Sequence, residues 1–235
     1  MSYRLSSKIL LGCCLLLASS LAAAGITLGS TRVVLSAPAK EASVLVKNQA
    51  NQDIMIQSWI EDESATGKQD VPFAITPALS RLGGGKQQNL RILYYGQGLP
   101  TDQESMFRLN VQEIPQKAKS ENTLQIALRQ RIKLFYRPAG LPGKVEDAPA
   151  ALEWRVTGRG LEVSNASPFH VSFGQVKFIS AGKSYDVNAD MAAPKSTLQL
   201  SIKNFPGNTS GPRKVEFETI NDYGGIDRHT SEVAN

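Results

Sequence analysis

Lys133 is the residue whose type and position first suggest binding chemistry in this chain. It follows Leu124, Ile126 and Leu128, which stand at every second position. This alternation places the three apolar side chains on one face of an extended strand, and Lys133 falls on the opposite parity. Exposed strands usually carry charges or proline that discourage pairing, but this row is apolar throughout. The pattern predicts a strand that pairs with a partner and ends beside an anion-binding lysine.

A second interpretation of the apolar row stays open at this level. A half-buried strand has the same alternation when its apolar side chains face the core of their own domain. The spacing of Leu124, Ile126 and Leu128 fits both arrangements equally well.

Catalytic and metal-binding chemistry has little support in the sequence. The two histidines are His170, in an alternating strand segment, and His229, in a polar C-terminal stretch, and both cysteines precede residue 15. This is too few ligands for a site rich in histidine or cysteine. The sequence lacks a Gly-x-Ser-x-Gly nucleophile motif, and its carboxylates are dispersed. We therefore expect a protein that is not an enzyme and uses no metal or cofactor.

Nucleotide and nucleic acid are also poor candidates for partners. The glycine triplet at 83–85 is not followed by the Lys-Ser/Thr pair and helix of a phosphate-binding loop. Without Arg4 and Lys8 the net charge is only +3, from 24 basic minus 21 acidic residues. Cationic blocks are absent and aromatic residues are scattered, so a mixed solvated surface is expected.

The first 24 residues have the layout of a cleavable secretory signal. Two basic residues precede an apolar run at 9–17, and small residues follow at 22–24. We expect the mature chain to begin at Gly25. It then contains no cysteine, so its stability depends on packing rather than on disulfides.

Two all-β halves are predicted from the short apolar segments that recur between turn-forming residues. The expected strands of the first half are 31–35, 42–47, 54–61, 89–95, 105–113 and 123–136. Those of the second half are 152–156, 160–164, 170–179, 197–202 and 215–220. The chain after residue 24 has room for two immunoglobulin-like β-sandwiches of about 100 residues each. Proline and glycine concentrate at 137–143, which places the expected domains at 25–143 and 144–235.

Several longer segments share their pattern with a known family: 25–35, 57–61, 75–77, 81–82, 107–115, 124–138 and 220–225. The most specific is Ile132-Lys-Leu-Phe-Tyr-Arg-Pro138. Together they resemble the PapD-like periplasmic pilus chaperones over nearly the whole mature sequence. The resemblance implies two immunoglobulin-like sandwiches set at an angle with a cleft between them. It also implies location in the periplasm.

The resemblance implies specific roles for several side chains. Arg32 and Lys133 match the cations that anchor the C-terminal carboxylate of a pilus subunit, although by type alone Arg32 fits an ordinary solvated charge. Leu124, Ile126 and Leu128 match the residues that such chaperones insert into a subunit missing its last strand. A third set matches ion pairs across the domain interface: Glu104, Arg137 and Asp222.

The expected function is that of a chaperone that binds and caps pilus subunits by donor-strand complementation and delivers them to an outer-membrane usher. The short segment 114–123 is similar to the short-loop branch of the family, whereas 145–151 matches nothing with a known role. The free protein could also associate with itself through its apolar strand. The alternative function is a structural or adhesive cell-surface module of two immunoglobulin-like domains.

Overall fold

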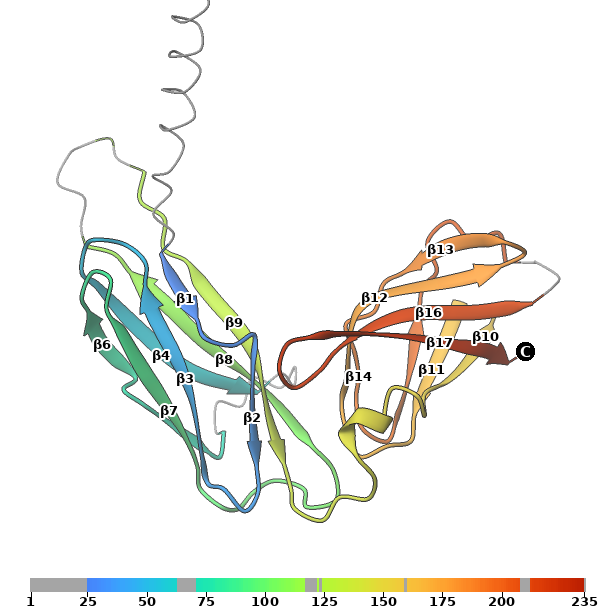
Figure 1. The fold of residues 1–235 in the computed structure, drawn as a ribbon, viewed down its shortest axis with the longest axis horizontal. Helices are drawn as coiled ribbons and strands as arrows, with labels where there is room; N and C mark the ends of the chain where they lie inside the picture. Colours follow the sequence, from blue (N-terminus) through green and yellow to red (C-terminus); the bar gives the residue numbers. More distant parts are fainter. Residues whose placement is uncertain are drawn as a thin grey trace, which may run out of the picture.

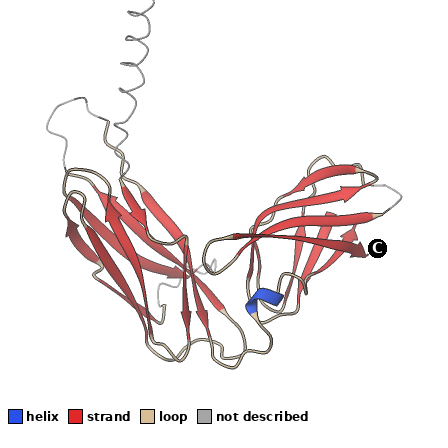
Figure 2. Cartoon of the chain, viewed as in Figure 1, coloured by secondary structure: helices blue, strands red, loops and turns tan. Residues whose placement is uncertain are grey.

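The computed structural model describes residues 25–62, 71–116, 122, 124–158, 160–207 and 212–234. The expected signal segment at 1–24 lies outside the described residues, and so does most of the short loop at 114–123. Figure 2 shows that the described chain consists of strands joined by loops, with one short helical turn. Within these ranges, no helix has the length and apolar character needed to cross a membrane.

Strands β1 to β9 build two sheets that enclose the first core. The order of one sheet is β1-β3-β7-β5, and that of the other is β2-β9-β8-β4-β6. The first comprises β1 (Ile26–Leu28), β3 (Glu41–Asn48), β5 (Phe73–Thr76) and β7 (Gln87–Tyr94). The second comprises β2 (Arg32–Ser36), β4 (Ile54–Asp62), β6 (Leu79–Leu82), β8 (Ser105–Ile114) and β9 (Arg129–Arg137).

Alternation along these strands determines which side chains form the first core. In β7 every second residue from Leu90 to Tyr94 is buried, while Arg91 points outward and pairs with Glu41 across the sheet. The same period of two buries Ile56 on the facing sheet. Side chains of both sheets therefore meet in one layer, as expected for a sandwich.

Strands β10 to β17 enclose a separate second core. They are β10 (Glu153–Thr157), β11 (Gly160–Asn165), β12 (Val171–Ser180), β13 (Lys183–Val187), β14 (Met191–Ala192), β15 (Ser196–Leu200), β16 (Arg213–Ile220) and β17 (Ile226–Ala234). Their order is β13-β12-β16-β17-β10-β11-β15, with β14 also paired to β12. Trp154 lies at the centre of this core, and its ring is 5.8 Å from Phe173 and 5.3 Å from Phe217.

The two sandwiches meet at an angle, and the loop between β16 and β17 turns back toward β2 and β9 (Figure 1). The connecting segment contains a short 3-10 helix, η1 (Val145–Asp147). Ala148 is buried in the second core, and Val145 and Leu141 pack against that core. Residues 145–151, which had no expected role, thus close one end of the second sandwich. Leu141 also packs against the second core, although it precedes the domain boundary expected after residue 143.

The structure differs from the expected strands in several ways. Strands β1, β5, β6, β13 and β14 were not predicted. The strand expected at 123–136 begins only at Arg129, the residue opposite Gln112 of β8. The C-terminal stretch predicted as a polar segment is instead β17, an exposed strand paired with both β16 and β10. His229 lies on β17, where its ring stacks 5.0 Å from that of Phe217.

Candidate functional site

Three cationic side chains lie abreast on one face of the first sandwich. Arg32 on β2 is directly opposite Lys133 on β9, in a parallel pair of strands. Arg108 on β8 is directly opposite Lys133 on the other side, in an antiparallel pair. Directly paired residues project to the same face of a sheet, so the three cations point the same way. The sequence predicted sites for Arg32 and Lys133, whereas it gave no sign of Arg108.

Strand β9 positions Lys133 by dividing its side chains between two environments. Leu134 is fully buried in the first core, and Tyr136 packs against the same core. Lys133, Phe135 and Arg137 alternate with them and therefore face the second sandwich. One apolar row thus anchors the strand while the other row presents its charges to the cleft.

The ammonium group of Lys133 is buried and already has partners in the second sandwich. The residue is 9% exposed, and its Nζ donates to Ser172 Oγ at 3.2 Å and to Asp190 Oδ1 at 3.0 Å. Burial lowers the pKa of Lys133, the nearby charges of Arg108 and Arg32 lower it further, and Asp190 opposes this shift. The site therefore holds a largely desolvated cation whose charged form Asp190 helps to stabilise.

Arg32 is buried to the same degree but is less completely paired. It is 8% exposed, its guanidinium donates to the carbonyl of Ile220 at 2.6 Å, and it lies 5.9 Å from the ring centroid of Phe135. Among the residues that the structure describes, its Nε has no hydrogen-bond partner. Burial also lowers the pKa of Arg32. A buried, incompletely bonded guanidinium of this kind is suited to bind an added acceptor.

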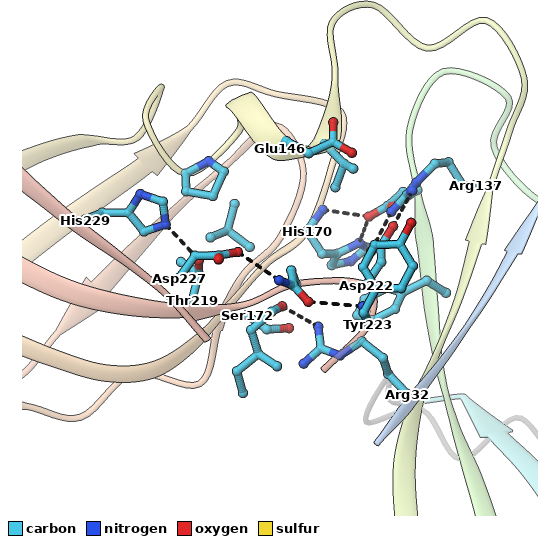
Figure 3. Close-up of a pocket in the computed structure, with 17 residues that line it drawn as sticks. Arg32, Arg137, Glu146, His170, Ser172, Thr219, Asp222, Tyr223, Asp227 and His229 are labelled. Atoms are coloured by element: carbon cyan, nitrogen blue, oxygen red, sulfur yellow. Dashed lines mark hydrogen bonds and ion pairs between the residues drawn. The ribbon is translucent and has the colours of Figure 1, made fainter. Parts of the chain in front are cut away.

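A cavity of about 340 Å³ lies between the sandwiches. Figure 3 shows Arg32 and Arg137 reaching into it from the first sandwich, while His170, Asp222 and Tyr223 line it from the second. In the described part of the chain, no three His, Cys, Asp or Glu residues gather closely enough to hold a metal ion. The cavity combines separate charged groups with apolar walls, which suits a polar chain end better than a metal.

Arg137 contacts carboxylates from both sandwiches. Its Nε donates to Glu104 Oε1 at 2.6 Å, and its two terminal nitrogens donate to the oxygens of Asp222 at 2.7 and 3.0 Å. Although burial acts in the opposite direction, the pKa of Arg137 is raised by Asp222 and Glu104. The three residues that the sequence grouped therefore lie in direct contact, and the bidentate pair fixes the orientation of the guanidinium.

His170 extends this network, which the sequence did not predict. Its backbone N–H donates to Glu104 Oε2 at 2.8 Å, and its ring Nδ1 lies 3.2 Å from the same oxygen. The ring is also 5.4 Å from that of Phe135. His170 immediately precedes β12, so its location in the interface depends on a fold that brings Glu104 beside it.

The apolar row lies at the other end of β9 and is exposed. The exposed fractions are 86% for Leu124, 63% for Ile126 and 49% for Leu128. Glu113 continues the ladder by one backbone bond to the carbonyl of Leu128, and the preceding residues have no regular structure. The interpretation in which these side chains face their own core is therefore wrong. The row is an exposed apolar segment that leads directly into the strand carrying Lys133.

Comparison with known families decides the class of protein. The profile described as "Pili and flagellar-assembly chaperone, PapD N-terminal domain" matches residues 25–142, and "Pili assembly chaperone PapD, C-terminal domain" matches residues 147–231. The chain belongs to the PapD-like pilus chaperone family. The two sandwiches of the structure correspond to the two matched domains of this family.

Similar proteins agree with this assignment. The chain is 40% identical over 223 residues to "Probable fimbrial chaperone LpfB" of Escherichia coli O157:H7, covering 93% of each chain. The crystal structure of the YadV chaperone has a TM-score of 0.79 and 35% identity, covering 89% of this chain and 100% of that one. A second structure, of Salmonella enterica SafA pilin in complex with the SafB chaperone, has a TM-score of 0.75 and 29% identity, with 88% and 95% covered.

Membership of this chaperone family confirms the fold class expected from the sequence, two all-β sandwiches. It does not favour the alternative of a structural or adhesive surface module. The family is one of chaperones rather than of enzymes.

Proposed function

We propose that this chaperone binds pilus subunits in the periplasm, caps them by donor-strand complementation and delivers them to an outer-membrane usher without using nucleotide. The observation that carries the proposal is the exposed apolar row 124–128, which leads along one strand to a buried, directly paired Arg32 and Lys133. The relative SafB in complex with SafA pilin supports the class of client. The fimbrial chaperones that resemble this chain support the compartment.

The same proposal covers the organisation of the chain. Residues 1–24 act as the cleaved signal that sends the chaperone to the periplasm. Residues 25–143 form the chaperone domain with its linker, and residues 144–235 form the second domain. The pairing of Arg137 with Glu104 and Asp222 then holds the two domains at a fixed angle.

Arg32 and Lys133 would anchor the C-terminal carboxylate of the subunit. A carboxylate has two oxygens, and the two cations stand side by side on adjacent strands, so each can donate to one of them. Each charge-assisted bond contributes about 1.5–3 kcal/mol when sheltered from water. The anchor would also set register, because a slip of one residue would turn the apolar row away from the subunit.

The apolar row would supply the remaining affinity. Burial of a leucine or isoleucine side chain contributes about 1.5–3 kcal/mol, so three of them contribute about 5–9 kcal/mol before ordering costs. The apolar side chains of the row are exposed and could enter the groove of an incomplete subunit, which is the mode of strand addition. Row and anchor together would therefore hold a subunit that neither could hold alone.

Co-purification of a tagged pilus subunit, co-expressed in the periplasm with the chaperone, tests the proposal. Arg32→Ala and Lys133→Ala should each reduce capture about tenfold or more, because each removes a charge-assisted bond to the carboxylate. Arg228→Ala and Lys47→Ala are matched controls, since both remove exposed cations that are not among the residues lining the cavity.

A second arm of this experiment changes the subunit instead. A subunit extended by residues beyond its natural C-terminus should lose capture by the native chaperone, because its carboxylate no longer reaches the anchor. Full capture by both anchor variants, or of the extended subunit, would show that no carboxylate is held at this site. Circular dichroism of each variant separates loss of binding from loss of folding.

A further inference from the structure

The buried ammonium of Lys133 is occupied by a carboxylate of the chaperone itself. Asp190 Oδ1 lies 3.0 Å from Lys133 Nζ, and Asp190 Oδ2 lies 3.6 Å from a terminal nitrogen of Arg108. Asp190 belongs to the second sandwich, whereas both cations belong to the first. The carboxylate therefore spans the cleft at the position where the proposed function requires the carboxylate of a subunit.

The backbone of Asp190 is fixed, but its side chain is free to move. Its carbonyl accepts a hydrogen bond from the backbone N–H of Phe173 at 2.8 Å, and β14 begins at the next residue. The side chain, in contrast, is 71% exposed, while that of Lys133 is only 10% exposed. A carboxylate attached to a fixed backbone and mostly in water is not itself desolvated, so it can rotate away at modest cost when another anion takes its place beside Lys133.

The charges around Lys133 indicate what the contact with Asp190 does in the free protein. Arg32 and Arg108 flank Lys133 on the neighbouring strands, and burial already disfavours its charged form. An ammonium in such surroundings without an anion would tend to lose its proton. Asp190 is the anion that offsets this tendency in the subunit-free protein.

We propose that Asp190 is a resident carboxylate that occupies the anchor in the free chaperone and is displaced by the C-terminal carboxylate of the subunit. This inference rests on the proposed function. The displaced side chain of Asp190 turns toward water and toward Arg108. Arg32, Lys133 and Arg108 then share two carboxylates, that of the subunit and that of Asp190. Exchange of one carboxylate for another leaves Lys133 paired and charged throughout.

Displacement has a consequence for selectivity. Any free carboxylate must compete with Asp190, which is tethered beside Lys133 and so has a high effective concentration. A small carboxylate without other contacts competes poorly. A subunit gains additional affinity from the apolar row 124–128 and can therefore displace Asp190. The resident carboxylate thus restricts the anchor to partners that also engage the exposed strand.

The test compares the native protein with Asp190→Asn, which keeps the shape of the side chain and removes its charge. The probes are two synthetic copies of the C-terminal strand of the co-expressed pilus subunit, one with a free carboxylate and one with a C-terminal amide. Calorimetry should show that Asp190→Asn binds the free-acid peptide about three- to tenfold more tightly than the native protein does. Binding of the amide should be unchanged.

Asp186→Asn is the matched control, because it removes an exposed carboxylate of the same domain on β13. It should leave both affinities as they are in the native protein. Asp190→Ser provides a second variant without the charge, should Asp190→Asn fold poorly. A direct readout is the carboxyl carbon signal of Asp190 in NMR spectra, which should shift when the acid peptide binds and stay in place with the amide.

The possible results separate this inference from the proposed function. The native protein could prefer the free-acid peptide while Asp190→Asn binds that peptide no more tightly than the native protein does. Asp190 would then not compete for the anchor and the inference would be wrong, but the proposed carboxylate anchor would be supported. If no variant distinguishes acid from amide, then no carboxylate anchor exists, and both the proposed function and this inference fail.

Discussion

Arg32 and Lys133 are directly opposite one another on the parallel strands β2 and β9. The backbone ladder therefore fixes the separation of their Cα atoms and directs both side chains to the same face of the sheet. Both residues are buried, which restricts their motion further. In the proposed function, two cations held in this way would bind one carboxylate with little conformational entropy left to lose.

Substitution Ile126→Asp should abolish capture of subunits and leave the free protein folded. Ile126 is mostly exposed, so the substitution should change the free energy of unfolding by no more than about 0.5 kcal/mol. In the complex, the same side chain would place a charge in an apolar pocket. Co-purification measures capture, and thermal denaturation of the free protein measures stability.

Leu134→Ala is the contrasting variant for this prediction. Leu134 has the same odd-even parity as Ile126 but is fully buried in the first core. Its truncation should lower the free energy of unfolding by about 2–5 kcal/mol. Loss of stability in Ile126→Asp on that scale would indicate that Ile126 packs inside the domain, contrary to its exposure.

Substitution Arg137→Ala should destabilise the protein and loosen the angle between the sandwiches. It would leave the buried carboxylate of Glu104 without its guanidinium partner, at a cost of about 3–5 kcal/mol. It would also release Asp222, which holds the second sandwich to Arg137. Thermal denaturation tests the first effect, and small-angle X-ray scattering, which measures the distribution of overall dimensions, tests the second.

A second substitution can separate the effect of losing the ion pairs of Arg137 from the effect of losing its side-chain volume. Arg137→Ala combined with Glu104→Gln removes both charges, so it should recover part of the lost stability. Arg228→Ala breaks an exposed pair with Glu218 inside one sandwich and should cost less than about 1 kcal/mol. An unchanged scattering profile for Arg137→Ala would mean that other contacts set the angle.

Capture of subunits should decline at alkaline pH before ordinary lysines lose their protons. Burial lowers the pKa of Lys133 from the usual 10.5, and only the charged ammonium attracts a carboxylate. As pH rises through this lowered pKa, the anchor loses one of its two charges, and affinity for the free-acid peptide should fall. Titration calorimetry at a series of pH values measures this fall.

Lys133→Arg is the companion variant for the pH series, because a guanidinium keeps its charge to much higher pH. Its residual affinity should stay constant where that of the native protein declines. The explanation would fail if both proteins showed the same decline, since the titrating group would then lie elsewhere.

The free chaperone should associate with itself as its concentration rises. Leu124, Ile126 and Leu128 are exposed, and an unpaired apolar segment readily pairs with another copy. Sedimentation velocity should detect dimers in the native protein and only monomers in a Leu124→Asp/Ile126→Asp variant. Dimers that persist in the double variant would place the contact on another surface.

Much of the fold follows from alternation that is visible in the sequence. The expected segments 54–61 and 105–113 differ from β4 and β8 by only a residue at their ends, because their apolar side chains repeat with a period of two and turn residues flank them. β17 escaped prediction because none of its residues is fully buried and its sequence carries no apolar alternation. Its strand character comes from pairing with β16 and β10, which no local pattern encodes.

Residues of the candidate site could be predicted only where they stand in a recognisable sequence motif. Lys133 stands in a distinctive segment, whereas Asp190 and Arg108 look like ordinary solvated charges in the sequence. Their contact with the site depends on the register of β8 against β9 and on the docking of one sandwich against the other. Such contacts between distant segments leave no trace in residue spacing, so the resident carboxylate could be recognised only in three dimensions.

The pairing of β2 with β9 also determines when the chaperone becomes competent during its own synthesis. These strands stand near the beginning and at the end of the first sandwich, so Arg32 and Lys133 can meet only once the chain is available through Arg137. Contacts so distant in sequence form late, after closure of a long loop. Ser172 and Asp190 further require the second sandwich. If the proposed function is correct, a partly folded copy would therefore have no assembled anchor for a client.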